Sequence, residues 1–160
     1  HTQKKKPRLE KGPIIVAVDT SGSMSGRPMQ IAYAVLLQLL RLARKQKRKV
    51  FLMSFSVGAK FLDLSLPRNW MRLKSFLENR FSGGTDGEEM LNLSIKMLQS
   101  KTFGMADVLI ISDFYFPLPK DSTWKKMLKE HGKGTCFYGL KIGSTDRLYD
   151  TILDKTWNIK

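Results

Sequence analysis

Two patterns of hydrophobic residues follow each other in turn along this chain. One is typical of buried strands and the other of helices. Short continuous apolar runs bounded by polar or glycine residues predict buried strands of a parallel sheet. Such runs occupy residues 13–18, 49–56, 107–112 and 135–142. Residues 59–64 alternate in polarity and predict a short neighbouring strand, and residues 156–159 suggest a last one.

Between these strands, apolar residues recur at the three- and four-residue spacing of amphipathic helices. The first helix is predicted from Met29, Ala32, Val35, Leu36, Leu39, Leu40 and Ala43. Others are predicted from Trp70, Leu73, Phe76 and Leu77, ending near Phe81; from Met90, Leu91, Ile95 and Leu98; and over residues 121–131. Strands that alternate with helices predict an α/β fold, a doubly wound and mostly parallel sheet flanked by helices.

Length and composition fit one globular domain. The chain has 160 residues, of which 42% are hydrophobic and 26% charged, so it can bury a core of its own. Cys136 is the only cysteine, which excludes an internal disulfide framework and a multi-cysteine zinc site. We interpret residues 1–12 as a basic linker or tail and residues 13–160 as the domain.

The formal charge of +14 points to acidic partners, nucleic acid or an anionic membrane surface. Basic residues cluster at 4–8 and 44–49, and neither cluster is interleaved with the aromatic residues of a base-stacking platform. A basic nucleic-acid-binding domain with weak, salt-sensitive affinity therefore stays open as an alternative. No apolar run approaches the ~20 residues of a membrane span, and we expect a reducing, cytoplasmic setting.

Three oxygen-rich segments stand where a site of a parallel sheet is expected, beyond the carboxyl ends of strands. Asp19 ends the first strand and is followed by the hydroxyls of Ser21 and Ser23; Asp113 ends another strand. Thr85 lies in a glycine-flanked loop that opens a helix. Carboxylate and hydroxyl oxygens suit a hard divalent cation such as Mg²⁺.

Each segment also has a purely structural explanation. Ser23 or Ser25 can cap the helix that starts near Arg27. Residues 85–88 fit a capping box, with Thr85 as the cap and Glu88 reaching back. Asp113 can be a polar strand terminus. The three segments together favour one shared site over three unrelated structural roles.

The motif Asp19-Thr-Ser-Gly-Ser23, with Thr85 in Gly-Gly-Thr-Asp and Asp113 in Ile-Ser-Asp, resembles the metal-ion-dependent adhesion site of von Willebrand factor A (VWA) domains. The resemblance covers residues 12–160 and implies a Rossmann-like VWA fold. It also implies that Ser21 and Ser23 ligate the metal directly and Asp19 directly or through water. Thr85 would ligate directly or through water, and Asp113 through a water. Asp86 inherits no firm role; it can orient the loop or cap the helix.

Within that family the motifs resemble most those of bacterial ViaA-like and CoxE-like proteins, which partner MoxR-type AAA+ ATPases. The resemblance implies a protein-interaction module that binds Mg²⁺, with Mn²⁺ or Ca²⁺ as alternatives, and engages a carboxylate of a MoxR-type ATPase or of its substrate.

We expect no catalytic residues. His131 falls at a helix end and Cys136 in a strand, where a solvated histidine and a buried thiol are the simpler interpretations. A Mg²⁺-dependent phosphoesterase is the remaining, weaker alternative.

Overall fold

The computed structural model of the chain describes residues 12–78 and 85–160. Its strands are β1 (Ile14–Asp19), β2 (Val50–Phe55), β3 (Ala59–Asp63), β4 (Asp107–Ser112), β5 (Phe137–Ile142) and β6 (Lys155–Ile159). Its α-helices are α1 (Arg27–Lys45), α2 (Leu73–Glu78), α3 (Gly87–Leu98) and α4 (Asp121–Gly132). Short 3-10 helices are η1 (Gly22–Met24), η2 (Pro67–Arg72), η3 (Lys101–Phe103) and η4 (Leu148–Thr151).

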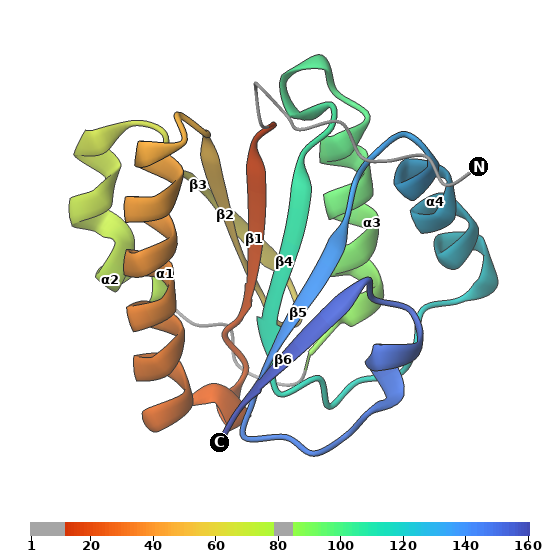
Figure 1. Cartoon of the computed structure of the whole chain (residues 1–160). Coiled ribbons are helices and arrows are strands. Elements are labelled where there is room, and N and C mark those ends of the chain that lie inside the picture. Colours follow the sequence, from red (N-terminus) through yellow and green to blue (C-terminus); the bar gives the residue numbers. More distant parts are fainter. Residues whose placement is uncertain (1–11, 79–84) are drawn as a thin grey trace.

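The strands form one sheet in the order β3-β2-β1-β4-β5-β6. All neighbours are parallel except β2 and β3, which pair antiparallel. The order reverses at β1, so the chain winds outward in both directions from the middle of the sheet (Figure 1). This confirms the predicted doubly wound α/β fold, and the antiparallel β3 is the alternating segment that the sequence singled out.

Two apolar layers cover the sheet. Helices α1 and α2 lie against one face, where Leu36 and Leu73 belong to the same apolar cluster as Val16. Helices α3 and α4 cover the other face, where Leu91 and Met127 belong to the same cluster as Ile110. Figure 1 shows these two helix pairs on opposite sides of the strands. The central strands are buried on both faces, which explains their continuous apolar sequences.

One predicted helix differs in form. The segment with Trp70 and Leu73 begins as η2 and becomes α-helical only from Leu73 to Glu78. Side-chain hydrogen bonds shape this start, because Asn69 Nδ2 donates to the Asp63 carbonyl and Trp70 Nε1 to the Leu64 carbonyl. The predicted helix end near Phe81 lies outside the described residues, as does nearly all of the predicted linker, since the description starts at residue 12.

Candidate metal centre

The carboxyl ends of β1 and β4 bring the two predicted aspartates to one edge of the sheet. Asp19 is the last residue of β1, and Asp113 directly follows the neighbouring β4. Both are buried, with 0% of Asp19 and 5% of Asp113 exposed. Two buried carboxylates side by side need a compensating charge or shared protons, because burial disfavours the ionised form.

Asp19 is held by hydrogen bonds on both carboxylate oxygens. Its Oδ1 accepts the Ser21 N–H at 2.9 Å, and its Oδ2 accepts the Ser112 hydroxyl at 2.6 Å. Ser112 is the last residue of β4, and its Oγ also accepts the Phe114 N–H at 2.8 Å. These contacts fix the carboxylate before any ligand arrives.

Burial is also the largest influence on the acidity of this group. Desolvation raises the pKa of Asp19, the hydrogen bonds from Ser112 and Ser21 oppose that rise, and the nearby charge of Asp113 adds to it. A cation between the two carboxylates would remove the repulsion and favour the ionised form.

The serine hydroxyls of the motif converge beside Asp19. Ser21 Oγ and Ser23 Oγ lie 3.2 Å apart; Ser21 is the cap residue of η1, and Ser23 lies within η1. Ser21 is buried and Ser23 exposed, and Met24, the last residue of η1, is fully buried. The alternative that Ser23 or Ser25 caps α1 is wrong, because the cap position is Gly26 and no side chain caps it. Ser25 donates instead to the Gly22 carbonyl.

The segment with Thr85 reaches the same edge of the sheet from the side of β2. The N–H of Asp86 donates to the carbonyl of Ser56, which follows β2. The N–H of Thr20, the residue after β1, donates to the Phe55 carbonyl at 2.8 Å. The segment that follows β1 and the segment that precedes α3 therefore both bind the carboxyl end of β2. Thr85 is half-buried there; among the described residues no hydrogen bond joins its hydroxyl to Asp19 or Asp113.

The capping-box interpretation of residues 85–88 is wrong. The helix cap is Asp86, whose Oδ1 accepts the Glu89 N–H at 2.8 Å. Glu88 turns away and binds the neighbouring helix instead, through the Lys120 N–H and the Thr123 hydroxyl. The Thr85 hydroxyl is therefore not used by the helix cap.

The donor set fits a hard cation. Within residues 12–78 and 85–160, no group of three or more His, Cys, Asp or Glu side chains gathers at one place. Any site at this edge would therefore combine two carboxylates with hydroxyls, the all-oxygen set that suits Mg²⁺ rather than a soft metal. The buried Ser56 Oγ, which has no hydrogen-bond partner in the described part of the chain, adds another hydroxyl beside this edge.

Sequence reasoning missed Ser112, which anchors Asp19. The signal was present in the tripeptide Ile-Ser-Asp, where a serine ends an otherwise apolar strand directly before Asp113. It also missed Lys141, whose backbone pairs with Ser112 in the sheet. The Lys141 side chain is 1% exposed, and its Nζ binds the Asp150 carboxylate and the Asp146 carbonyl, both at 2.8 Å.

The residues weighed as catalytic alternatives lie at the other end of the sheet. Cys136 is buried and directly precedes β5. His131, near the end of α4, pairs with Asp154 at 2.8 Å, and Asp154 Oδ2 accepts the N–H of Phe137, the first residue of β5. Neither side chain is positioned to act on a ligand at the Asp19 edge.

The doubly wound sheet, with an Asp-x-Ser-x-Ser turn at its carboxyl edge, has the Rossmann-like α/β architecture of VWA domains. A family model described as the von Willebrand factor type A domain matches residues 14–115, and the chain belongs to this family. It is also similar to the regulatory protein ViaA of Edwardsiella ictaluri (strain 93-146), with 36% identity over 133 residues. That alignment covers 82% of this chain and 28% of the relative, so the chain spans little more than a quarter of it.

Solved structures agree on the fold. The conserved hypothetical protein BatB of Bacteroides thetaiotaomicron superimposes with a TM-score of 0.65 at 16% identity, covering 94% of this chain and 90% of that one. The SpRpn10 VWA domain gives a TM-score of 0.66 at 12% identity, covering 94% and 88%. Within the described residues, no helix is both long and apolar enough to cross a membrane.

Proposed function

We propose that this VWA domain binds Mg²⁺ through Asp19, Ser21, Ser23, Thr85 and Asp113, and uses the ion to hold a carboxylate of a partner protein. The observation that carries the proposal is the fixed Asp19 carboxylate, held by Ser21 and Ser112 beside a second buried aspartate. Mn²⁺ and Ca²⁺ also bind oxygen donors and are the alternative ions for this site.

The residues of the proposed site would contribute different kinds of ligand to the metal ion. Asp19 and Asp113 would supply negative charge, and the hydroxyls of Ser21 and Ser23 would supply neutral oxygen donors from one turn. The bound ion would provide a positive charge with a coordination position free for an outside carboxylate. Because two aspartates roughly neutralise the ion, a partner carboxylate and the metal would stabilise each other's binding.

A role in binding another protein is supported by the similarity to ViaA, whose name describes a regulatory protein. We propose a MoxR-type AAA+ ATPase, or a substrate of it, as the protein that presents the carboxylate, and a cytoplasmic setting for the complex. A non-enzymatic role is supported by family membership and by the distance in the fold between the Asp19 edge and His131 or Cys136.

Calorimetric titration with MgCl₂ tests the metal site. We expect the wild-type domain to release or absorb heat with a saturable curve, and Asp19→Ala to give none. Asp121→Ala is the matched control, because it removes an exposed carboxylate at the start of α4. Equal curves for wild type and Asp19→Ala would contradict the proposal.

The partner half of the proposal needs a separate test. The full-length parent protein immobilised on resin should retain its ATPase partner in Mg²⁺ and lose it in EDTA. Retention that is equal in both buffers would show that the partner binds elsewhere, and it would leave the calorimetric result on the metal unaffected.

A further inference from the structure

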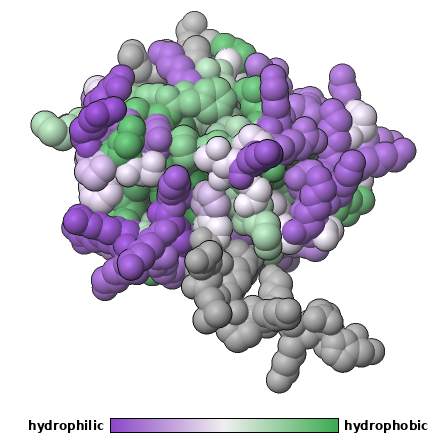
Figure 2. Space-filling view, turned by 90° about the horizontal axis from the view of Figure 1, so that it is seen from above, coloured by the Kyte–Doolittle hydropathy of each residue, from purple (hydrophilic) through white to green (hydrophobic). Residues whose placement is uncertain are grey.

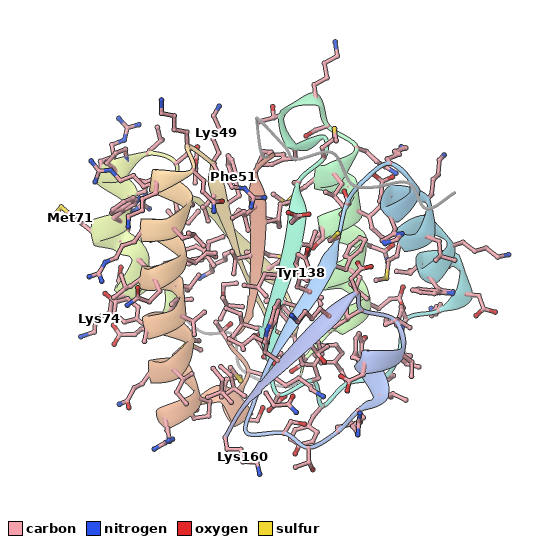
Figure 3. All side chains as sticks on the ribbon, in the orientation of Figure 1. Lys49, Phe51, Met71, Lys74, Tyr138 and Lys160 are labelled. Carbon is pink, nitrogen blue, oxygen red and sulfur yellow. The ribbon has the colours of Figure 1, made fainter. Side chains whose placement is uncertain are left out.

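A second surface with a definite chemical character lies at the amino ends of the strands, opposite Asp19. A groove of about 390 Å³ runs there between the end of α1, the turn into β2 and the segment between β3 and η2. We call it the basic groove and define it by Leu40, Arg44, Lys47, Lys49, Leu66 and Trp70. In Figure 3 the Lys49 label marks this end of the molecule and the Lys160 label the other.

The floor of the basic groove is apolar. The indole of Trp70 is half-buried, and its Nε1 donates to the Leu64 carbonyl at 2.7 Å. Leu66 beside it remains 38% exposed. Figure 2 looks down on this end of the molecule and shows apolar surface bordered by hydrophilic side chains. An exposed apolar strip framed by charges is typical of an interaction site.

Cations line the walls. Arg44, Lys47 and Lys49 are exposed, and no carboxylate of the described residues forms an ion pair with them. Arg48 differs, because its side chain is only 10% exposed and binds Asp107 and the Gly12 carbonyl. Within the described part of the chain, Arg48 is therefore bound by the fold itself, whereas the other three cations have no carboxylate partner and can meet an outside anion.

Lys47 occupies a backbone position that favours glycine. Its φ is 56°, and the turn after α1 closes with the Arg48 N–H on the Ala43 carbonyl at 2.8 Å. A residue with a Cβ is less stable than glycine in this left-handed conformation. Lysine at this position therefore lowers the local stability and places a positive charge in the lining of the groove.

The shape and chemistry favour a protein ligand over nucleic acid. The Arg44 guanidinium lies 5.9 Å from the centre of the Trp70 ring, so this face of the ring is covered by a cation and does not offer an open stacking platform. Leucine side chains and Pro67 form the rest of the floor. An apolar floor between cationic walls fits a protein segment whose apolar side chains are flanked by carboxylates.

We propose that the basic groove binds an acidic amphipathic segment of a partner protein, with its apolar side chains on Leu66 and on the part of Trp70 that Arg44 leaves exposed, and its carboxylates on Arg44, Lys47 and Lys49. This contact needs no metal and lies at the end of the sheet opposite Asp19. A partner bound at both ends would hold the domain at two separate places.

A labelled peptide that alternates Glu with Leu and Phe serves as the probe, titrated into the whole chain in EDTA so that no metal contributes. We expect saturable binding that weakens about tenfold in Lys47→Glu/Lys49→Glu. The control Lys125→Glu/Lys129→Glu makes the same change of net charge on exposed positions of α4 and should leave the affinity within about twofold.

Lys47→Gly separates binding from folding. It removes the backbone cost, so we expect a folded protein of equal or higher stability that binds the peptide several-fold more weakly. Met105→Gly relieves the same left-handed conformation, with φ 65°, outside the groove and should bind like wild type.

Three results would overturn the proposal. The first is that the peptide does not bind. The second is that the charge reversals in the groove and on α4 weaken peptide binding equally. The third is that a single-stranded oligonucleotide binds more tightly than the peptide and that the groove variants lose this oligonucleotide binding. The last result would identify the groove as a nucleic-acid surface. A failure of any kind here leaves the calorimetry at Asp19 untouched, because all titrations contain EDTA.

Discussion

At the scale of single residues, the candidate metal centre depends on a serine that would bind no metal. The Ser112 hydroxyl donates to Asp19 Oδ2 and accepts the Phe114 N–H, and both Ser112 and Asp19 are fully buried. Ligand geometry in metal sites is commonly set by such neighbours, which orient the ligating oxygens.

Ser112→Ala should therefore lower both stability and metal affinity. The substitution leaves Asp19 Oδ2 and the Phe114 N–H without their partner, which costs about 1–3 kcal/mol of unfolding free energy. We expect Mg²⁺ affinity to fall about 10- to 100-fold, because Asp19 loses its fixed orientation. Urea denaturation and calorimetry measure the two effects.

The matched control for that experiment is Ser100→Ala, which removes an exposed hydroxyl bound to the Met97 carbonyl. It should leave metal binding unchanged. A Ser112→Ala protein with wild-type affinity for Mg²⁺ would show that Asp19 is positioned by other groups.

Lys141 shows how a buried charge is held close to this edge. Its ammonium is satisfied by Asp150 and the Asp146 carbonyl, and the hydrogen bond from Lys141 is the main reason why the pKa of Asp150 lies below its ordinary value. Asp150→Ala should destabilise the fold by about 3 kcal/mol, because it leaves an unpaired cation in the interior.

Thermal unfolding of Asp150→Ala and of the double variant Asp150→Ala/Lys141→Met measures this effect. The double variant should recover much of the lost stability, since the buried charge is gone as well. If it is less stable than Asp150→Ala alone, burial of the lysine charge is not the source of the cost.

At the scale of elements, Glu88 joins the starts of α3 and α4. Its carboxylate accepts the Lys120 N–H at 2.8 Å, the Thr123 hydroxyl and Asn92 Nδ2 at 3.1 Å. Desolvation alone would raise the pKa of Glu88, but these hydrogen bonds outweigh it and lower the pKa below its ordinary value.

This lowered pKa predicts an acid-dependent contribution to stability. The contribution is complete above the ordinary carboxyl pKa and is lost as the pH falls through the lowered pKa of Glu88. Glu88→Gln should cost about 1–2 kcal/mol at neutral pH and make stability less sensitive to acid. Glu89→Gln, an exposed neighbour, is the control, and parallel pH profiles for Glu88→Gln and wild type would contradict the assignment.

The elements themselves were largely predictable from the sequence, because buried parallel strands are continuously apolar and the covering helices are amphipathic. The details at helix starts were not. Asp86 rather than Thr85 caps α3, and Glu88 serves the neighbouring helix. A local capping pattern cannot reveal that a side chain has a better partner on another element.

At the scale of the whole molecule, the two ends of the sheet differ in chemistry. The carboxyl edge gathers Asp19, Asp113 and hydroxyl groups, whereas the amino edge carries the basic groove. Motif order predicted the first, since sites of doubly wound sheets lie at the strands' carboxyl ends. The groove was not predictable, because Trp70 meets Arg44 only through tertiary packing.

Magnesium should stabilise the folded domain as a whole if it binds only the folded state. At a concentration 100 times the dissociation constant, the gain is about 2.7 kcal/mol. We expect the melting temperature of wild type to rise with MgCl₂ and that of Asp19→Ala to stay constant. An equal rise in both proteins would indicate a salt effect rather than a site.

The most direct measurement is an anomalous difference map from crystals grown with Mn²⁺, which shares the preference of Mg²⁺ for oxygen ligands. The account predicts one strong peak within about 2.3 Å of Ser21 Oγ and Ser23 Oγ, between Asp19 and Asp113. A map with no peak there, and with the Asp19 carboxylate still bound to Ser112, would contradict it.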